Sequence, residues 1–123
     1  MAIRIKEIAF VFHPVTDAAR ARKFYEGALG LAPGMQIEFS PGMWWIEYDI
    51  GGTALAICNA PMGEPSGPAS SLALEVESLE DAKAALSAAG AAIVQDVMEF
   101  PPCRMFVAAD PDGNRITFHR RKA

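Results

Sequence analysis

The sequence predicts an α+β domain of two tandem βαβββ modules, whose strands form one curled mixed sheet around a cup-shaped cavity. Three observations predict it. The chain has 123 residues, 51% of them hydrophobic, which suits one domain with its own core. Two helix patterns occur, each preceded by one strand-like run and followed by three. Finally, Val15 and Val76 are 61 positions apart, as are Gly52 and Gly113, which indicates a duplicated unit.

The first module spans about residues 1–58 of the predicted single domain, 1–123. A strand-like run over 5–15 leads to Asp17, a residue that favours a helix N-cap, and Gly30 ends the apolar helical pattern that follows. Three further strand-like runs, separated by turn-forming residues, lie over 35–39, 43–50 and 53–58.

A segment rich in proline and glycine, about residues 59–70, predicts a linker, and the second module spans about 71–123. Its helix begins after the predicted N-cap Ser78, with which Asp81 can form a capping box, and it ends at Gly90. Its strand-like runs lie over 72–76, 92–100, 104–109 and 115–119. The order of elements therefore repeats that of the first module.

Charge and hydropathy exclude several classes of partner. Eleven basic against fifteen acidic residues give a net charge of −4, without the basic surface of a nucleic-acid-binding protein. No apolar run has the length of a signal-peptide core or a membrane span, so we expect no membrane partner. The two cysteines form no dense framework and are predicted to be reduced, as in a cytoplasmic protein.

Four motifs follow one another along nearly the whole chain. They are VTD at 15–17, RKFYEGALGL at 22–31, LEV at 74–76 and DPDGN at 110–114. In this order they resemble the vicinal-oxygen-chelate superfamily, which includes glyoxalase I, bleomycin-resistance proteins and extradiol dioxygenases. The resemblance implies the paired-module fold and a homodimer whose cups are shaped partly by the partner. It does not fix the reaction, because this fold hosts several chemistries and also proteins that only bind.

The resemblance also implies where a divalent metal would lie. Enzymes of the family typically hold it with His, Glu or Gln near the first and last strand of each module. The equivalent positions here are Phe10, Ala56, Ser71 and Thr117, and none supplies imidazole, carboxylate or thiolate. We therefore expect no metal cofactor, and we expect the cup to bind a small apolar or aromatic molecule, as resistance-type members do.

Two polar residues are candidates for catalysis. Strand alternation places His119 on the same face as Thr117, and Glu75 on the same face as Ser71, so both can line the cup and transfer a proton. A plain alternative is a strand-end histidine and an ion-paired glutamate without a catalytic role.

A metal-dependent glyoxalase-like lyase, isomerase or dioxygenase is the alternative function. It would use relocated ligands, His13, Glu75 and His119, around Zn, Ni, Fe or Mn. His13 has the wrong strand parity for such a site unless Pro14 bends the strand. Whether the protein is an enzyme stays open at this stage.

The remaining candidates are ligand-binding residues. Of the neighbours Trp44 and Trp45, one indole should face the cup. Cys103 beside Arg104 suggests an activated thiol or a clamp for an anionic group, although the two side chains project to opposite faces, and a buried cysteine with a surface arginine is the plainer interpretation. The predicted ligand contacts are Phe10, Trp45, Ser71, Cys103, Arg104 and Thr117.

Overall fold

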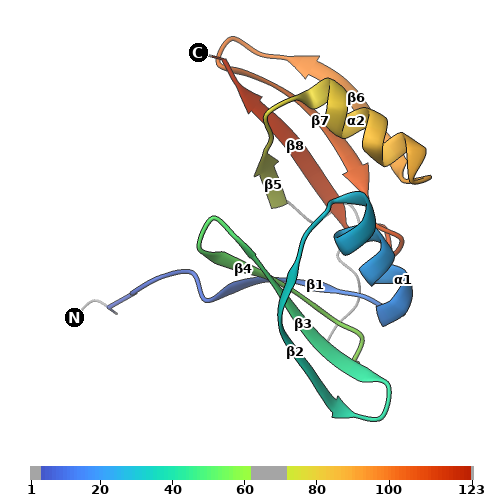
Figure 1. Cartoon of the computed structure of the whole chain (residues 1–123). Helices are drawn as coiled ribbons and strands as arrows, with labels where there is room; N and C mark the ends of the chain where they lie inside the picture. The colour runs from blue at the N-terminus through green and yellow to red at the C-terminus, as the bar shows by residue number, and fades with distance from the viewer. Residues whose placement is uncertain (1–3, 62–71, 123) are drawn as a thin grey trace.

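The computed structural model describes residues 4–61 and 72–122, and in both modules it contains the predicted order of strand, helix and three strands (Figure 1). The elements of the first module are β1 (Phe10–Pro14), α1 (Ala18–Arg22), the π-helical η1 (Lys23–Ala28), β2 (Pro33–Ser40), β3 (Met43–Ile50) and β4 (Thr53–Cys58). Those of the second are β5 (Leu72–Glu75), α2 (Leu79–Ala88), β6 (Ala92–Glu99), β7 (Cys103–Ala109) and β8 (Arg115–Arg121). Most of the predicted linker lies outside the described residues.

The strands form two mixed sheets of four, one for each module, in the orders β1-β4-β3-β2 and β5-β8-β7-β6. Strand β1 runs parallel to β4, and β5 runs parallel to β8, while the other pairs are antiparallel. The α+β class and the two modules are confirmed. The sheet is divided, however, because β1 and β5 each form an outer edge and no described ladder joins them.

Both predicted helix starts are confirmed. The Asp17 carboxylate accepts a hydrogen bond from the Arg20 amide at 2.9 Å, and the Ser78 hydroxyl accepts one from the Asp81 amide at 3.1 Å. The first helix then widens, because the Leu29 amide donates five residues back, to the Phe24 carbonyl, at 3.0 Å. This π-helical turn buries Phe24 and Tyr25.

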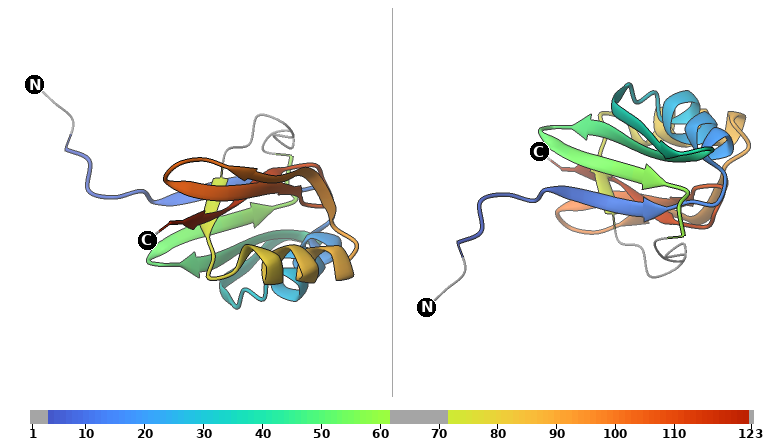
Figure 2. Two further views of the ribbon diagram at one scale, coloured as in Figure 1. Left: turned by 90° about the horizontal axis from the view of Figure 1, so that it is seen from above. Right: turned by 90° about the horizontal axis from the view of Figure 1, so that it is seen from below.

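The first strand is shorter than predicted. It begins at Phe10 instead of residue 5, because its parallel partner β4 follows a tight turn and offers Ala54 as the first residue to pair. The preceding residues lie outside the ladder and leave Ile5 and Ile8 85% and 67% exposed. Figure 2 shows this N-terminal segment leaving the body of the molecule.

One buried cluster draws side chains from both modules. Tyr25, Ile46 and Tyr48 of the first module belong to it, together with Leu79 and Phe106 of the second. Along β3 and β7 these residues alternate with ones that lie on the opposite sheet face. Each sheet therefore has a core face and a second face, and the second faces carry most of the predicted site. No helix among residues 4–61 and 72–122 is long and apolar enough to cross a membrane.

Candidate functional site

The second face of the first sheet carries a cluster of three aromatic rings, which we call the aromatic face. Trp45 on β3 stacks on Phe12 of β1, with ring centroids 5.5 Å apart, and meets Phe10 edge to face at 5.1 Å. The Trp45 indole N–H donates to Glu47 Oε2 at 2.7 Å, which fixes the ring. Phe10 remains 45% exposed. The arrangement offers a planar ligand a prearranged stacking surface.

The second face of the other sheet carries a carboxylate–imidazole pair, which we call the dyad. Glu75 on β5 and His119 on β8 are paired in register, and Glu75 Oε1 lies 2.6 Å from His119 Nδ1. Glu75 Oε2 accepts a hydrogen bond from the Arg121 amide at 2.8 Å. That backbone hydrogen bond, followed by the one to His119, lowers the pKa of Glu75.

The dyad is accessible. The side chains of Glu75 and His119 are 40% and 22% exposed. A carboxylate on Nδ1 orients the ring, and no hydrogen bond found among the described residues uses Nε2. Nε2 can therefore exchange a hydrogen bond or a proton with a bound molecule.

The residues at the family's metal positions do not fit a divalent ion. Phe10 and Ala56 have no donor atom, and Thr117, on the same strand face as His119, offers a single neutral hydroxyl. Ser71 lies outside the described residues. Within the described part of the chain, no group of three His, Cys, Asp or Glu side chains could hold a metal ion.

His13 lies in the core, away from the relocated site suggested for it. Its side chain is 3% exposed, and its Nδ1 lies 2.8 Å from the Tyr25 hydroxyl, which donates to Asp110 Oδ2 at 2.8 Å. Because that hydroxyl gives its only proton to Asp110, neutral His13 carries its own proton on Nδ1. The fold thus does not bring His13 together with Glu75 and His119.

This buried network connects the two modules. Asp110, which is 4% exposed, also accepts hydrogen bonds from the backbone amides of Asp112 and Asn114, and from the Asn114 side chain, all at 2.9 Å. Asn114 Nδ2 lies 2.9 Å from the Pro14 carbonyl as well. Burial lowers the pKa of His13, with partial opposition from the Asp110 charge, and burial followed by Asp110 raises the pKa of Tyr25.

Sequence reasoning missed this network. The DPDGN motif and Tyr25, within RKFYEGALGL, entered that reasoning only as parts of the family resemblance. The usable signal was chemical: a buried tyrosine, aspartate and asparagine each need a hydrogen-bond partner.

The other predicted ligand contacts separate between faces. Trp44 packs against the core, which leaves Trp45 on the aromatic face. Cys103 is a free thiol, 7% exposed. Arg104 Nη1 lies 3.0 Å from Glu80 of α2, and Arg104 Nε lies 2.7 Å from Glu99 of β6. Arg104 thus lies on the helix-facing side of β7 and is held by two carboxylates.

The aromatic face and the dyad belong to different sheets. Among residues 4–61 and 72–122, no hydrogen bond, ion pair or ring contact joins Phe10, Phe12 or Trp45 to Glu75 or His119. The aromatic face and the dyad are therefore two separate clusters in the described part of the chain.

Comparison with known proteins assigns the fold and the family. The model of the glyoxalase/bleomycin resistance protein/dioxygenase superfamily matches residues 7–118. No curated protein matches. Among solved structures, the chain is similar to a protein from Bacillus anthracis described as a glyoxalase family member (TM-score 0.79, 24% identity, covering 99% of this chain and 100% of that one).

Two further structures show the same likeness. One is a superfamily member from Sphaerobacter thermophilus, with a TM-score of 0.78, 20% identity, and coverage of 95% of this chain and 98% of that one. The other is an antibiotic-binding protein from Streptomyces, with a TM-score of 0.78, 22% identity, and coverage of 98% and 100%. At these identities the structures establish the fold alone. The family model covers most of the sequence, and the chain therefore belongs to the glyoxalase/bleomycin resistance protein/dioxygenase superfamily.

Proposed function

We propose that this protein binds a small planar, largely apolar molecule without using a metal ion. One observation carries the proposal. Phe10, at a position where enzymes of the family place a metal ligand, is part of a partly exposed aromatic cluster with Trp45. A ring that stacks there gains apolar burial and a favourable aromatic geometry, and both contributions are independent of metal.

The dyad supplies the polar groups of the proposed site. Glu75 and His119 can orient one hydroxyl or carbonyl group of the ligand through Nε2, which matches the usual plan of an apolar pocket with a few placed polar groups. The likeness to an antibiotic-binding protein from Streptomyces supports a binding role. Thr117 lies on the same face and can add one hydroxyl contact.

A second copy of the chain would complete the site. Strand β2 is a sheet edge with exposed Met35, Ile37 and Phe39, and Ile37 lies directly opposite Trp45, so the apolar surface continues from the aromatic face to that edge. In the proposed homodimer this surface of one copy meets the dyad of the other. Ile37→Glu should convert the dimer into a monomer in sedimentation equilibrium, and a wild-type monomer would contradict the proposal.

The second candidate function is metal-free proton transfer. The 2.6 Å contact between Glu75 and His119, with Nε2 unused among the described residues, is the observation that favours it. An isomerisation that moves one proton on a bound carbonyl compound would need no more than this pair. Under this function, loss of the imidazole in His119→Ala would abolish turnover, whereas under the binding function it would only weaken affinity.

Calorimetric titration with 2-naphthol, a flat neutral phenol, tests the binding function. We expect saturable binding that Trp45→Ala weakens roughly tenfold or more through loss of stacking area, while Trp44→Phe, in the core, leaves it unchanged. Amide shifts on binding should fall on β1, β3 and β8. Absence of binding, or equal binding by Trp45→Ala, would contradict the proposal.

A further inference from the structure

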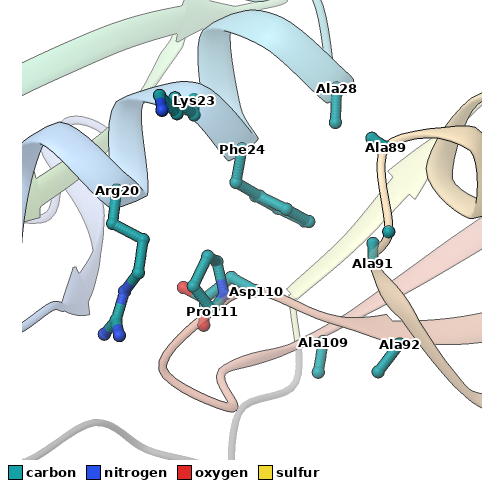
Figure 3. Close-up of a pocket in the computed structure, with 11 residues that line it drawn as sticks. Arg20, Lys23, Phe24, Ala28, Ala89, Ala91, Ala92, Ala109, Asp110 and Pro111 are labelled. Carbon is teal, nitrogen blue, oxygen red and sulfur yellow. The ribbon is translucent and has the colours of Figure 1, made fainter.

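A cavity of about 410 Å³ lies where the two modules meet, and it involves neither the aromatic face nor the dyad (Figure 3). The first module contributes Phe24 and Ala28 from its helical segment. The second contributes the residues that follow α2, Ala89 to Ala92, together with Ala109 at the end of β7. Its volume suits a ligand of one or two fused rings.

The body of the cavity is apolar. The Phe24 ring points into it, toward Ala28, Ala89 and Ala91 (Figure 3). Tyr25 contacts that ring edge to face, with centroids 5.0 Å apart. The facing alanine methyls are short, so a flat ring can enter beside Phe24 with little rearrangement.

Two basic residues lie at the rim on the α1 side. Lys23 is exposed and forms no ion pair among the described residues. Arg20 Nη2 donates to Thr16 and forms an ion pair with Asp112, both at 2.9 Å, so Asp112 compensates its charge and Lys23 is the cation left for a ligand.

The acidic residue of the wall, Asp110, is hydrogen-bonded on its buried side. Both carboxylate oxygens of Asp110 already accept hydrogen bonds, from Tyr25, Asn114 and two backbone amides. These donors, all in the buried network, partly offset its negative charge. An anionic group is favoured near Lys23, and an apolar group near the alanines.

We propose that this cavity is a second small-molecule site, for an aromatic carboxylate. The ring lies between Phe24 and the alanines, and the carboxylate meets Lys23 at the rim, with Arg20 beside it. Because the occupant contacts both modules next to Asp110, its binding stabilises their packing, and it raises the melting temperature by mass action. The site is independent of the function proposed for the aromatic face and the dyad.

The test uses 1-naphthoate, with 1-naphthalenemethanol as the uncharged analogue of the same ring. We expect 1-naphthoate to raise the melting temperature and to shift amides of residues 20–28, 89–92 and 109–111. Lys23→Gln should weaken its binding about threefold, the scale of one exposed charge pair. Lys83→Gln, which removes a lysine of α2 outside the cavity lining, is the matched control and should bind as wild type.

Filling the cavity gives the sharper result. Ala89→Leu, at an exposed position of the wall, should abolish binding, and Ala92→Leu serves if the first variant does not fold. Absence of binding by the wild type would overturn the proposal. So would shifts confined to the aromatic face, equal affinity for 1-naphthalenemethanol, or wild-type affinity in a folded cavity-filling variant.

Discussion

The two histidines of this chain show how position assigns a role to one residue type. His13 is 3% exposed and contacts a phenol whose proton is given to a buried carboxylate. His119 is 22% exposed and contacts the carboxylate of Glu75 directly. The first takes part, through Tyr25, in the buried network that joins the modules, and the second presents a nitrogen to the surface. Burial, more than residue type, separates the stabilising group from the candidate functional one.

The largest expected difference between the two networks is in stability. Asp110→Ala removes the acceptor of the Tyr25 hydroxyl and of two backbone amides, and one of the acceptors of the Asn114 side chain, and it should lower the free energy of unfolding by about 3 kcal/mol or more. Glu75→Ala, in the exposed dyad, should cost far less. Urea unfolding measures both variants, and equal losses would contradict the division of roles.

The second expected difference is in pH dependence. Burial lowers the pKa of His13 below its ordinary value of 6.5, so the unfolded chain binds a proton before the folded one does. The contribution of His13 to the free energy of unfolding is therefore fully present above pH 6.5. It falls as the pH drops toward the pKa of His13 in the folded protein, by at most about 1.4 kcal/mol per pH unit. Urea unfolding at a series of pH values from 7.5 down to 5 measures it.

The variants of the two histidines separate the sources of that dependence. His13→Gln should flatten the loss of stability between pH 6.5 and the lower folded pKa, although the carboxylates continue to titrate at more acidic pH. His119→Gln keeps His13 and should keep the loss. A profile that is unchanged in His13→Gln would show that another group controls it.

The smallest expected effect is on ligand binding. His119→Gln retains a donor but loses the oriented imidazole, so its affinity for 2-naphthol should fall about threefold to tenfold, the scale of one hydrogen bond. Its unfolding midpoint in urea should stay near that of the wild type. A large loss of stability with unchanged affinity would reverse the roles assigned to the two histidines.

Local signals made most of the fold predictable. The caps at Asp17 and Ser78 and the glycines that end each helix act over a few residues, and the structure has both helices where those signals place them. The start of β1 and the division into two sheets depend on which strands pair, and pairing is set by contacts far apart in the sequence. The π-helical turn at Lys23–Ala28 has no comparable sequence signal.

The site was predictable only where strand alternation sufficed. Alternation placed Glu75 and His119 on compatible faces, and the parallel β5–β8 register brings them together. It also separated Cys103 from Arg104, but it could not tell which of them faces the helix. Tyr25 and Asp110 are 85 positions apart, and no local pattern links them.

The most direct test of the central claim is to measure ligand binding with the metal content of the same sample known. Protein purified without added metal is analysed by mass spectrometry for Zn, Ni, Fe and Mn, and it is titrated with 2-naphthol before and after dialysis against a chelator. Because Phe10, Ala56 and Thr117 offer no suitable ligand set, the dissociation constant should change by less than about twofold. Binding that disappears on chelation and returns with one equivalent of metal would contradict the account.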